Sequence, residues 1–506
     1  MTTAAVLGVD IGTSSSKAVL VSLAGDVLAT ATREHRVDLP APGHVEMDPA
    51  VWWHELCALT RELLAARDVA VAAVGVSGMG PCVVLADGRG AALRPAILYG
   101  VDTRAEAEIE ELTRRYGEDE LAARSGSLLS TQAVGPKLAW LAAHEPDAFA
   151  GARKLLMPSS WLVYRLTGAY VLDHHSASQS DPLYDIEAER WYEPWWDDLA
   201  PGIERPALLW PGDAAGTVTA AAAQETGLPE GTPVLAGTVD AWAEAVSGDA
   251  HNLGDLMLMY GSTLFFVHTV DRLLRSPVLW STVGAYPGTR SLAAGMATSG
   301  SITAWLRDLF GGSDYGELVA EAAASPAGAH GLLLLPYFAG ERTPFADPRA
   351  RGVLAGLTLA HTRGDLYRSA LEATAFGVRH NLEALEASGA EIARIVAVGG
   401  GTTGALWTQI VSDVTGREQV VPAKTVGASY GDAYLAACAV SQPSIADWNP
   451  PAEIVRPRRE HEALYDDLYE LYRDLYPATA ATVHALADEQ IRSANPALAG
   501  QKGSTT

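Results

Sequence analysis

Two segments far apart in the chain share one plan: an apolar strand, a turn of small residues and a second apolar strand. The first runs from Val6 through a turn at 12–16 to Ser22, and the second runs from Leu256 through a turn at 261–263 to Val267. Strands joined by so short a turn pair antiparallel, so each segment predicts the opening of a β-meander. The repetition predicts two related domains, with two unrelated strand–turn–strand units as the alternative.

Helical and strand patterns alternate after the first meander, which indicates an α/β fold. Asp48 stands where a helix N-cap is expected. The main expected elements are helices over 49–67, 102–116, 316–324, 365–388 and from about 460 to 475 with a continuation after Pro477, and strands over 69–77 and 392–398.

The domain boundary is expected between Gly237 and Asp255, where the second copy of the plan is about to begin. This predicts one domain over residues 1–246 and a second over 247–490. The remaining residues, 491–506, are small and polar towards their end and are expected to form a flexible tail.

Composition excludes several classes of function. The chain has 506 residues and a net charge of −25, and so acidic a surface repels the phosphates of nucleic acids. The three cysteines lie far apart, which argues against a disulfide framework or a zinc site. We find neither a signal peptide nor an apolar run of 18 residues, so we expect a cytoplasmic protein with no membrane partner.

The first small-residue turn has the chemistry of a phosphate site. Backbone N–H groups and hydroxyls at 12–16 could contact phosphate oxygens, and Asp10, at the end of the preceding strand, could hold Mg²⁺. The second copy has Met259 and Tyr260 in the place of that carboxylate. The spacing is not that of a P-loop. An ordinary hairpin with no ligand remains the alternative.

Two further segments could carry chemistry. Asp240 follows the apolar strand 234–236 and precedes an alanine-rich segment, so it could act as a general base, or simply cap a helix. Three glycines at 399–401 follow a strand and would let the backbone approach a base or a phosphate. A strand-to-helix turn without a ligand is the alternative for those glycines.

Taken together, the motifs resemble those of the FGGY family of carbohydrate kinases, in the expected order and over nearly the whole chain. The segments that carry the resemblance are Gly8–Ser14, Gly43–Pro49, Gly237–Ala241, Tyr260–Thr263, Pro336–Pro344, Gly352–Leu357 with Asp365-Leu366 and Ser369–Glu372, and Gly399–Gly401 with Trp407, Gln409 and Asp413. The family's N-terminal signature is matched in part, by Lys137–Leu141 but with Val134 where a small hydroxyl residue or proline is usual.

The resemblance implies two actin-like (ribonuclease H-like) ATPase domains with a catalytic cleft between them, and the cofactors ATP and Mg²⁺. It implies that Asp240 is the general base and that Asp10 is the carboxylate on the metal side. The nucleotide-binding residues that it implies are Gly12, Thr13, Ser14, Ser15, Lys17, Gly261, Ser262, Thr263, Gly400, Gly401 and Thr402. The substrate-binding residues are Met79, Gly80, Pro81, Asp102, Arg104 and Asp240.

The resemblance is nearest to xylulose kinase-like members, so the expected reaction is phosphorylation of a ketopentose such as xylulose. Xylulose kinases carry a Met-His pair where this chain has Gly80-Pro81. A kinase for ribulose, glycerol or a sugar acid is therefore the alternative, and a non-catalytic sugar sensor or scaffold on the same fold is the rival from another class. The oligomeric state is left open, with a homodimer as one option.

Overall fold

The computed structural model describes residues 3–494, and its contacts divide the chain into two compact units. Unit 1 comprises Met1–Asp255, Val267–Leu292 and Pro422–Pro451, and unit 2 comprises Leu256–Phe266, Ala293–Val421 and Ala452–Thr506. Neither unit is continuous in sequence. The family-domain boundary near residue 246 stays a prediction. Of the predicted tail, residues 495–506 lie outside the described residues, and 491–494 end the last helix.

The sheet of unit 1 begins with the predicted meander. Strands β1 (Thr3–Ile11), β2 (Ser15–Ser22) and β3 (Val27–Glu34) pair antiparallel in that order, and β5 (Val69–Gly78) joins the other side of β1 in parallel. The full strand order is β13-β14-β5-β1-β2-β3, with β13 at Ala214–Thr217, β14 at Pro233–Leu235 and the short β15 (Thr238–Val239) also paired with β5.

The second sheet repeats this order. It runs β18-β19-β17-β16-β22-β23-β24, so that β16 stands where β1 stands in the first sheet, β17 where β2 stands and β22 where β5 stands. This correspondence supports the predicted duplication. The bounds are β16 (Asp255–Tyr260), β17 (Leu264–Val270), β18 (Trp280–Val283), β19 (Arg290–Met296), β22 (Arg394–Val398), β23 (Gln419–Pro422) and β24 (Pro451–Val455).

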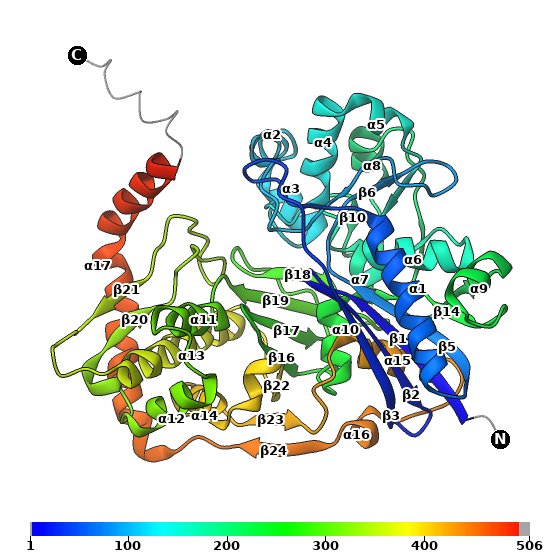
Figure 1. The fold of residues 1–506 in the computed structure, drawn as a ribbon. Helices are drawn as coiled ribbons and strands as arrows, with labels where there is room; N and C mark the ends of the chain where they lie inside the picture. Colours follow the sequence, from blue (N-terminus) through cyan, green and yellow to red (C-terminus); the bar gives the residue numbers. More distant parts are fainter. Residues whose placement is uncertain (1–2, 495–506) are drawn as a thin grey trace, which may run out of the picture. The chain divides into compact units, whose positions relative to one another are not determined.

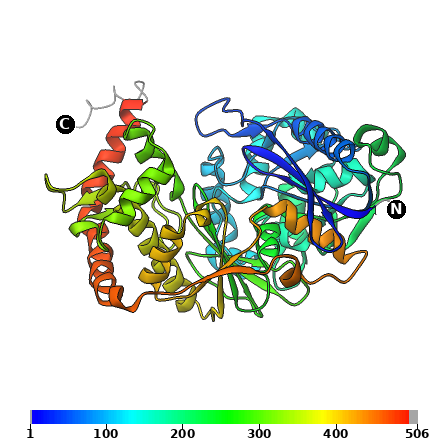
Figure 2. The same ribbon diagram turned by 60° about the horizontal axis from the view of Figure 1, so that its bottom comes forward.

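Helices surround these strands (Figures 1 and 2). Those of unit 1 are α1 (Pro49–Ala66), α2 (Glu106–Tyr116), α3 (Glu118–Ser125), α4 (Val134–His144), α5 (Pro146–Gly151), α6 (Pro158–Thr167), α7 (His174–Ala177), α8 (Glu193–Leu199), α9 (Ala220–Thr226), α10 (Asp240–Ser247), α15 (Ala428–Cys438) and α16 (Ile445–Trp448). Those of unit 2 are α11 (Gly300–Leu309), α12 (Tyr315–Ala324), α13 (Arg363–Ala387), α14 (Ala405–Thr415) and α17 (Glu462–Ala494), with the short 3₁₀ turns η1 (Ala329–Gly331), η2 (Gly400–Thr403) and η3 (Arg459–His461).

Short paired strands complete the fold. They are β4 (Glu46–Met47) with β7 (Ala96–Ile97), β6 (Val84–Ala86) with β8 (Lys154–Leu156), β9 (Val171–Asp173) with β12 (Ala207–Leu209), β10 (Tyr184–Asp185) with β11 (Arg190–Trp191), and β20 (Leu333–Leu335) with β21 (Val353–Ala355). The predicted helices and strands are present, and most of their ends move by a few residues. The last helix runs through Pro477 as far as Ala494. The N-cap prediction is confirmed, because the Asp48 side chain accepts a hydrogen bond from the N–H of Ala50 at 2.9 Å.

The two faces of the first sheet are covered by helices from distant parts of the chain. Alternate residues of β1, namely Leu7, Val9 and Ile11, join an apolar core with the buried side of α1. Residues between them face α15, which packs against β1 and β5. Figure 1 and Figure 2 both show α15, in orange, beside the blue strands of the first quarter of the chain.

Glycines allow α15 to lie directly on the strands. Gly8 and Gly75 are register partners on β1 and β5. A Cβ atom at Gly8 would lie 1.9 Å from the carbonyl oxygen of Ser429, and one at Gly75 would lie 2.2 Å from that of Asp432. Both distances are far below van der Waals contact, so a larger side chain would force the helix off the sheet.

None of the helices within residues 3–494 has the combination of length and apolar character that crossing a membrane requires.

We predict that Gly75→Ala lowers the free energy of unfolding by about 1–3 kcal/mol or more, because the added methyl group overpacks the contact with the α15 backbone. Urea unfolding monitored by tryptophan fluorescence measures the effect. Gly88→Ala is the matched control, since a Cβ there would meet no atom within 4 Å. Equal stability of the two variants would contradict the packing described above.

Candidate active site

The site begins where β1 and β5 end. Asp10 and Ser77 are register partners on these parallel strands, two residues beyond the glycine pair and on the same face of the sheet. The Oγ atom of Ser77 lies 2.8 Å from Oδ1 of Asp10 and 2.7 Å from Oδ2 of Asp432 on α15. A hydroxyl has only one hydrogen to donate. Both contacts are therefore hydrogen bonds only when one of the two carboxyl groups holds a proton.

Asp432 is the carboxyl group that burial most strongly favours in its protonated form. Its residue is 1% exposed, and its Oδ1 atom has no hydrogen-bond partner among the described residues. Burial, and then the negative charge of Asp10, raise the pKa of Asp432 well above its ordinary value. A protonated Asp432 can donate to Ser77, which in turn donates to Asp10 and orients it.

Helix α10 brings two more carboxyl groups to the same place. Asp240 is the first residue of the helix, and its Oδ1 accepts from the N–H of Ala241 at 2.7 Å. Burial, and then the charge of Asp10, raise the pKa of Asp240. The same two causes raise the pKa of Glu244, one helical turn later, to about 7. The predicted base and the predicted metal-side carboxylate therefore interact within one unit.

Lys17 supplies positive charge to this acidic cluster. It is paired with Asp10 in the antiparallel register of β1 and β2, and its ammonium group donates to the carbonyl of Val426. Its charge opposes the rise in pKa of both Asp10 and Glu244. Lys17 was predicted to contact nucleotide, and the structure places it beside the predicted metal carboxylate.

The donor set fits Mg²⁺. Asp10 is a carboxylate that burial only partly covers, and the unpartnered Oδ1 of Asp432 is a second hard oxygen nearby in the network. Residues 3–494 contain no cluster of three histidine, cysteine, aspartate or glutamate side chains that could hold a metal ion alone. Mg²⁺ commonly uses one or two carboxylates and completes its shell with water and substrate phosphates, so Asp10 would hold it in that way.

The first small-residue turn is tight and partly exposed. The N–H of Gly12 donates to the carbonyl of Ser15 at 3.0 Å. The hydroxyl groups of Thr13 and Tyr99 are 2.9 Å apart, while Ser14 is exposed. The turn keeps polar groups at the same end of β1 as Asp10.

The second turn, in unit 2, is closed by a similar bond that spans one residue fewer. The N–H of Gly261 donates to the carbonyl of Thr263 at 3.0 Å. The segment 299–301 at the start of α11 supports it, because the N–H of Gly300 donates to Gly261 and the N–H groups of Ser299 and Ser301 donate to Ser262, all at 3.0 Å. In place of a carboxylate, the preceding strand ends in buried Tyr260, which donates to Gln419 at 2.6 Å.

Two other parts of unit 2 border these segments. Glu341 and Arg342 hold the end of β19 that leads into 299–301: Glu341 accepts from the N–H of Ala297 at 2.8 Å, and Arg342 donates to the carbonyl of Met296 at 2.9 Å. The glycine run forms η2, where a Cβ at Gly401 would meet Trp407 and Tyr260 at 2.8 Å.

The remaining glycine-run residues differ in their surroundings. A Cβ at Gly400 would meet no atom within 4 Å, so its backbone is open to a ligand. Thr402 instead turns its hydroxyl back to the carbonyl of Gly399 at 2.8 Å.

The residues predicted to bind substrate fall into two groups. Met79 is buried, and its N–H donates to the carbonyl of Ile11 at 2.8 Å. The following Gly80-Pro81 bond is cis, and a Cβ at Gly80 would lie 3.0 Å from Val239, the residue before Asp240. The first group therefore lies next to the predicted base.

Asp102 and Arg104 form the second group and satisfy one another. The Arg104 guanidinium is fully buried and bonds both oxygens of Asp102, at 2.9 and 3.1 Å from Nε, and Glu46 at 2.6 Å. Asp102 also accepts from the N–H of Val45 at 2.6 Å. These contacts occupy the polar atoms that the prediction assigned to a sugar, so a direct contact by them stays a prediction.

Sequence reasoning missed Ser77, Glu244 and Asp432 as members of the site. Glu244 carries a local signal, because a residue four positions after Asp240 lies on the same helical face. Asp432 is the one charged residue in the α15 sequence, which is a signal of function in a buried helix. Ser77 carries no local signal.

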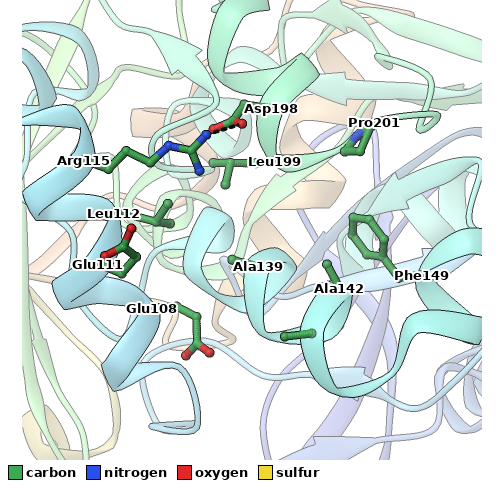
Figure 3. Close-up of a pocket in the computed structure, with 11 residues that line it drawn as sticks. Glu108, Glu111, Leu112, Arg115, Ala139, Ala142, Phe149, Asp198, Leu199 and Pro201 are labelled. Carbon is green, nitrogen blue, oxygen red and sulfur yellow. Dashed lines mark hydrogen bonds and ion pairs between the residues drawn. The ribbon is translucent and has the colours of Figure 1, made fainter.

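Away from these residues, unit 1 has a groove of about 410 Å³ between α2, α4 and α8. Figure 3 shows the side chains that line it, among them the apolar Leu112 and Phe149 and the ion pair of Arg115 and Asp198. None of the predicted site residues lines it.

Comparisons with known proteins find relatives of moderate identity over most of the chain. Models of the FGGY family of carbohydrate kinases match it, the N-terminal domain over residues 5–247 and the C-terminal domain over 256–440. The chain is 29% identical to the xylulose kinase of Escherichia coli (strain K12), covering 93% of this chain and 98% of that protein. It is 31% identical to the glycerol kinase of Alkalilimnicola ehrlichii, covering 86% and 90%.

A solved structure agrees with the described fold. The crystal structure of xylulose kinase from Rhodospirillum rubrum superposes with a TM-score of 0.87 at 33% identity, and covers 95% of this chain and 100% of that one. The two-domain α/β fold expected from the sequence is thereby confirmed.

We predict that Asp432→Asn stabilises the metal-free protein at neutral pH, because burial and the charge of Asp10 raise the pKa of Asp432 in the folded state. A raised aspartate pKa means that the folded state binds a proton that the unfolded state has lost, so the stability of the unaltered protein falls as pH rises above about 4. Asparagine does not titrate, so the variant lacks this fall in stability at higher pH. Urea unfolding in EDTA at pH 4.5 and 7.5 measures the difference.

The gain from Asp432→Asn should shrink towards zero as the pH approaches 4, where Asp432 is protonated in both states. Asp447→Asn on exposed α16 is the control and should change nothing. A gain that is equal at both pH values would contradict the assignment of the proton to Asp432.

Proposed function

Because the chain belongs to the FGGY family of carbohydrate kinases, we propose that it transfers the γ-phosphoryl group of ATP to a hydroxyl group of a ketopentose such as xylulose. The protein is a sugar kinase, and the identity of the sugar is the new element of the proposal. The full-length likeness to xylulose kinases supports it. The observation that carries the chemistry is the position of Asp240 at the start of α10, partly exposed and within the electrostatic influence of Asp10.

Asp240 would accept the proton of the attacking sugar hydroxyl. A general base works best when its pKa lies near the working pH, and burial together with the charge of Asp10 moves the pKa of Asp240 upward in that direction. The bond from the N–H of Ala241 holds one carboxylate oxygen in place, which leaves the other to receive the proton.

The turns would contact the nucleotide phosphates. In unit 1 this role falls to Gly12, Thr13, Ser14 and Ser15, with Lys17 adding positive charge, and in unit 2 to Gly261, Ser262 and Thr263. The open backbone at Gly400, with the neighbouring Gly401 and Thr402, would contact the nucleoside part. Mg²⁺, held by Asp10, would neutralise the charge that develops on the transferring phosphoryl group.

The sugar would lie next to Asp240, against the segment Met79–Pro81. This segment offers an apolar side chain, a glycine and a proline, and no cation, which favours a neutral sugar over an acidic one. Asp102 and Arg104 would support the sugar site indirectly. Their buried ion pair holds Asp102 in place, and Asp102 accepts the hydrogen bond that fixes the backbone at residue 45.

Glycerol or another polyol is the second candidate. The likeness to a glycerol kinase at 31% identity favours it, as does Gly80-Pro81 in the place of the Met-His pair of xylulose kinases. An ADP-release assay on a panel of ketoses, polyols and aldonates decides between them. We expect the highest kcat/KM with a neutral ketopentose. Release of ADP with none of the compounds would refute kinase activity and favour a sugar sensor.

We predict that Asp240→Asn lowers kcat by about 10²–10⁴-fold, because the amide cannot accept the proton, while the dissociation constant for Mg-ATP changes less than threefold. Steady-state kinetics and calorimetry measure the two quantities. Glu244→Gln is the matched control, one turn along the same helix, and should keep most of the turnover. Equal losses in the two variants would point to the charge of the cluster, and not to proton transfer by Asp240.

A further inference from the structure

A histidine and a glutamate lie behind the first small-residue turn and belong to none of the motifs discussed above. His35 directly follows β3, and Glu55 lies on α1. Their side chains are only 5% and 14% exposed. The ring Nδ1 of His35 is 2.9 Å from Oε2 of Glu55, so the two side chains form a pair that is almost removed from solvent.

The pair also forms hydrogen bonds to the turn itself. Nε2 of His35 lies 3.0 Å from the carbonyl oxygen of Gly12, and the backbone N–H of His35 donates to the carbonyl of Ser14 at 3.0 Å. Ser16 donates its hydroxyl hydrogen to Oε2 of Glu55 at 2.6 Å. Three residues of the turn are thus tied to two residues outside it.

The chemistry of the partners fixes the direction of these bonds. A carbonyl oxygen can only accept, so Nε2 of His35 must carry a hydrogen and donate it to Gly12. An ionised Glu55 can also only accept, so the contact at Nδ1 is a hydrogen bond when His35 carries hydrogens on both ring nitrogens. In that form the contact with Glu55 holds the ring in the orientation that the Gly12 bond needs. Glu55 therefore acts on the turn twice, through His35 and through Ser16.

We propose that His35 and Glu55 form a positioning pair that shapes the first turn for an anionic phosphate. This inference rests on the proposed function, which assigns nucleotide phosphate to the turn. Hydrogen bonds from His35 hold the carbonyl oxygens of Gly12 and Ser14 in place. Without these bonds the two oxygens could turn towards the phosphate and repel its oxygens. Neither residue is a catalytic residue.

The pair also balances charge close to the ligand. The chain has a net charge of −25, and an unpaired Glu55 behind the turn would add a repulsive charge at the place where phosphate binds. The ring of His35 lies against that carboxylate and so reduces its repulsion of the phosphate. Loss of His35 should therefore weaken nucleotide binding more than loss of the charge on Glu55, and removing that charge should partly rescue the loss.

The test compares His35→Ala, Glu55→Gln and the double variant in the full-length chain. Calorimetry measures the dissociation constant for Mg-ATP, and steady-state kinetics give KM for the sugar. We expect His35→Ala to weaken Mg-ATP binding roughly tenfold and Glu55→Gln roughly threefold, as expected for the loss of a buried hydrogen-bonded partner. The double variant should resemble Glu55→Gln, and KM for the sugar should stay within twofold.

His54→Ala and Glu62→Gln are the controls, since both residues are exposed on α1 and neither should change Mg-ATP binding. The inference is overturned if His35→Ala binds Mg-ATP within twofold of the unaltered chain, or if KM for the sugar rises as much as the dissociation constant. Failure of the unaltered chain to bind Mg-ATP overturns the proposed function as well. Normal binding by both the unaltered chain and His35→Ala overturns only the positioning role.

Discussion

The contact of helix α15 with strands β1 and β5 is the constraint on which the site in unit 1 depends. Two glycines side by side on the strands let the helix backbone lie directly on the sheet, at Gly8 and Gly75. Two residues further along the same face are Asp10 and Ser77, so the approach of the helix also carries Asp432 into hydrogen-bond distance of Ser77. Close packing and the arrangement of the acidic groups are therefore a single feature of the fold.

This arrangement brings four carboxyl groups together where burial makes their charged forms unfavourable. Burial raises the pKa of Asp10, Asp240, Glu244 and Asp432, and the negative charge of Asp10 adds to that effect at the other three. Such a cluster is unfavourable for folding alone, because carboxylates lose hydration without gaining a full set of partners. It is favourable for a site that receives a metal ion and a proton, which agrees with the membership of the chain in a kinase family.

The repeated plan is used unequally by the two copies. Both turns are closed by a bond from a glycine N–H to a carbonyl oxygen, three residues ahead at Gly12 and two residues ahead at Gly261. The strand before the first turn ends in Asp10, whereas the strand before the second ends in Tyr260, whose hydroxyl is bonded to Gln419 inside the protein. One copy of the plan thus keeps a carboxylate at the strand end, and the other replaces it with a packed aromatic ring.

The sequence by itself determined the strand–turn–strand repeat, the α/β class, the cap at Asp48 and the residue types at Asp10, Asp240 and the two turns. These features rest on local periodicity and on motifs of a few adjacent residues. Only the tertiary structure decided which groups surround them. Asp432 meets Ser77 across 355 residues of sequence, Arg104 turns to Asp102 and Glu46, and His35 and Glu55 close behind the first turn. No local pattern encodes such partners, because the packing of whole helices on a sheet brings them together.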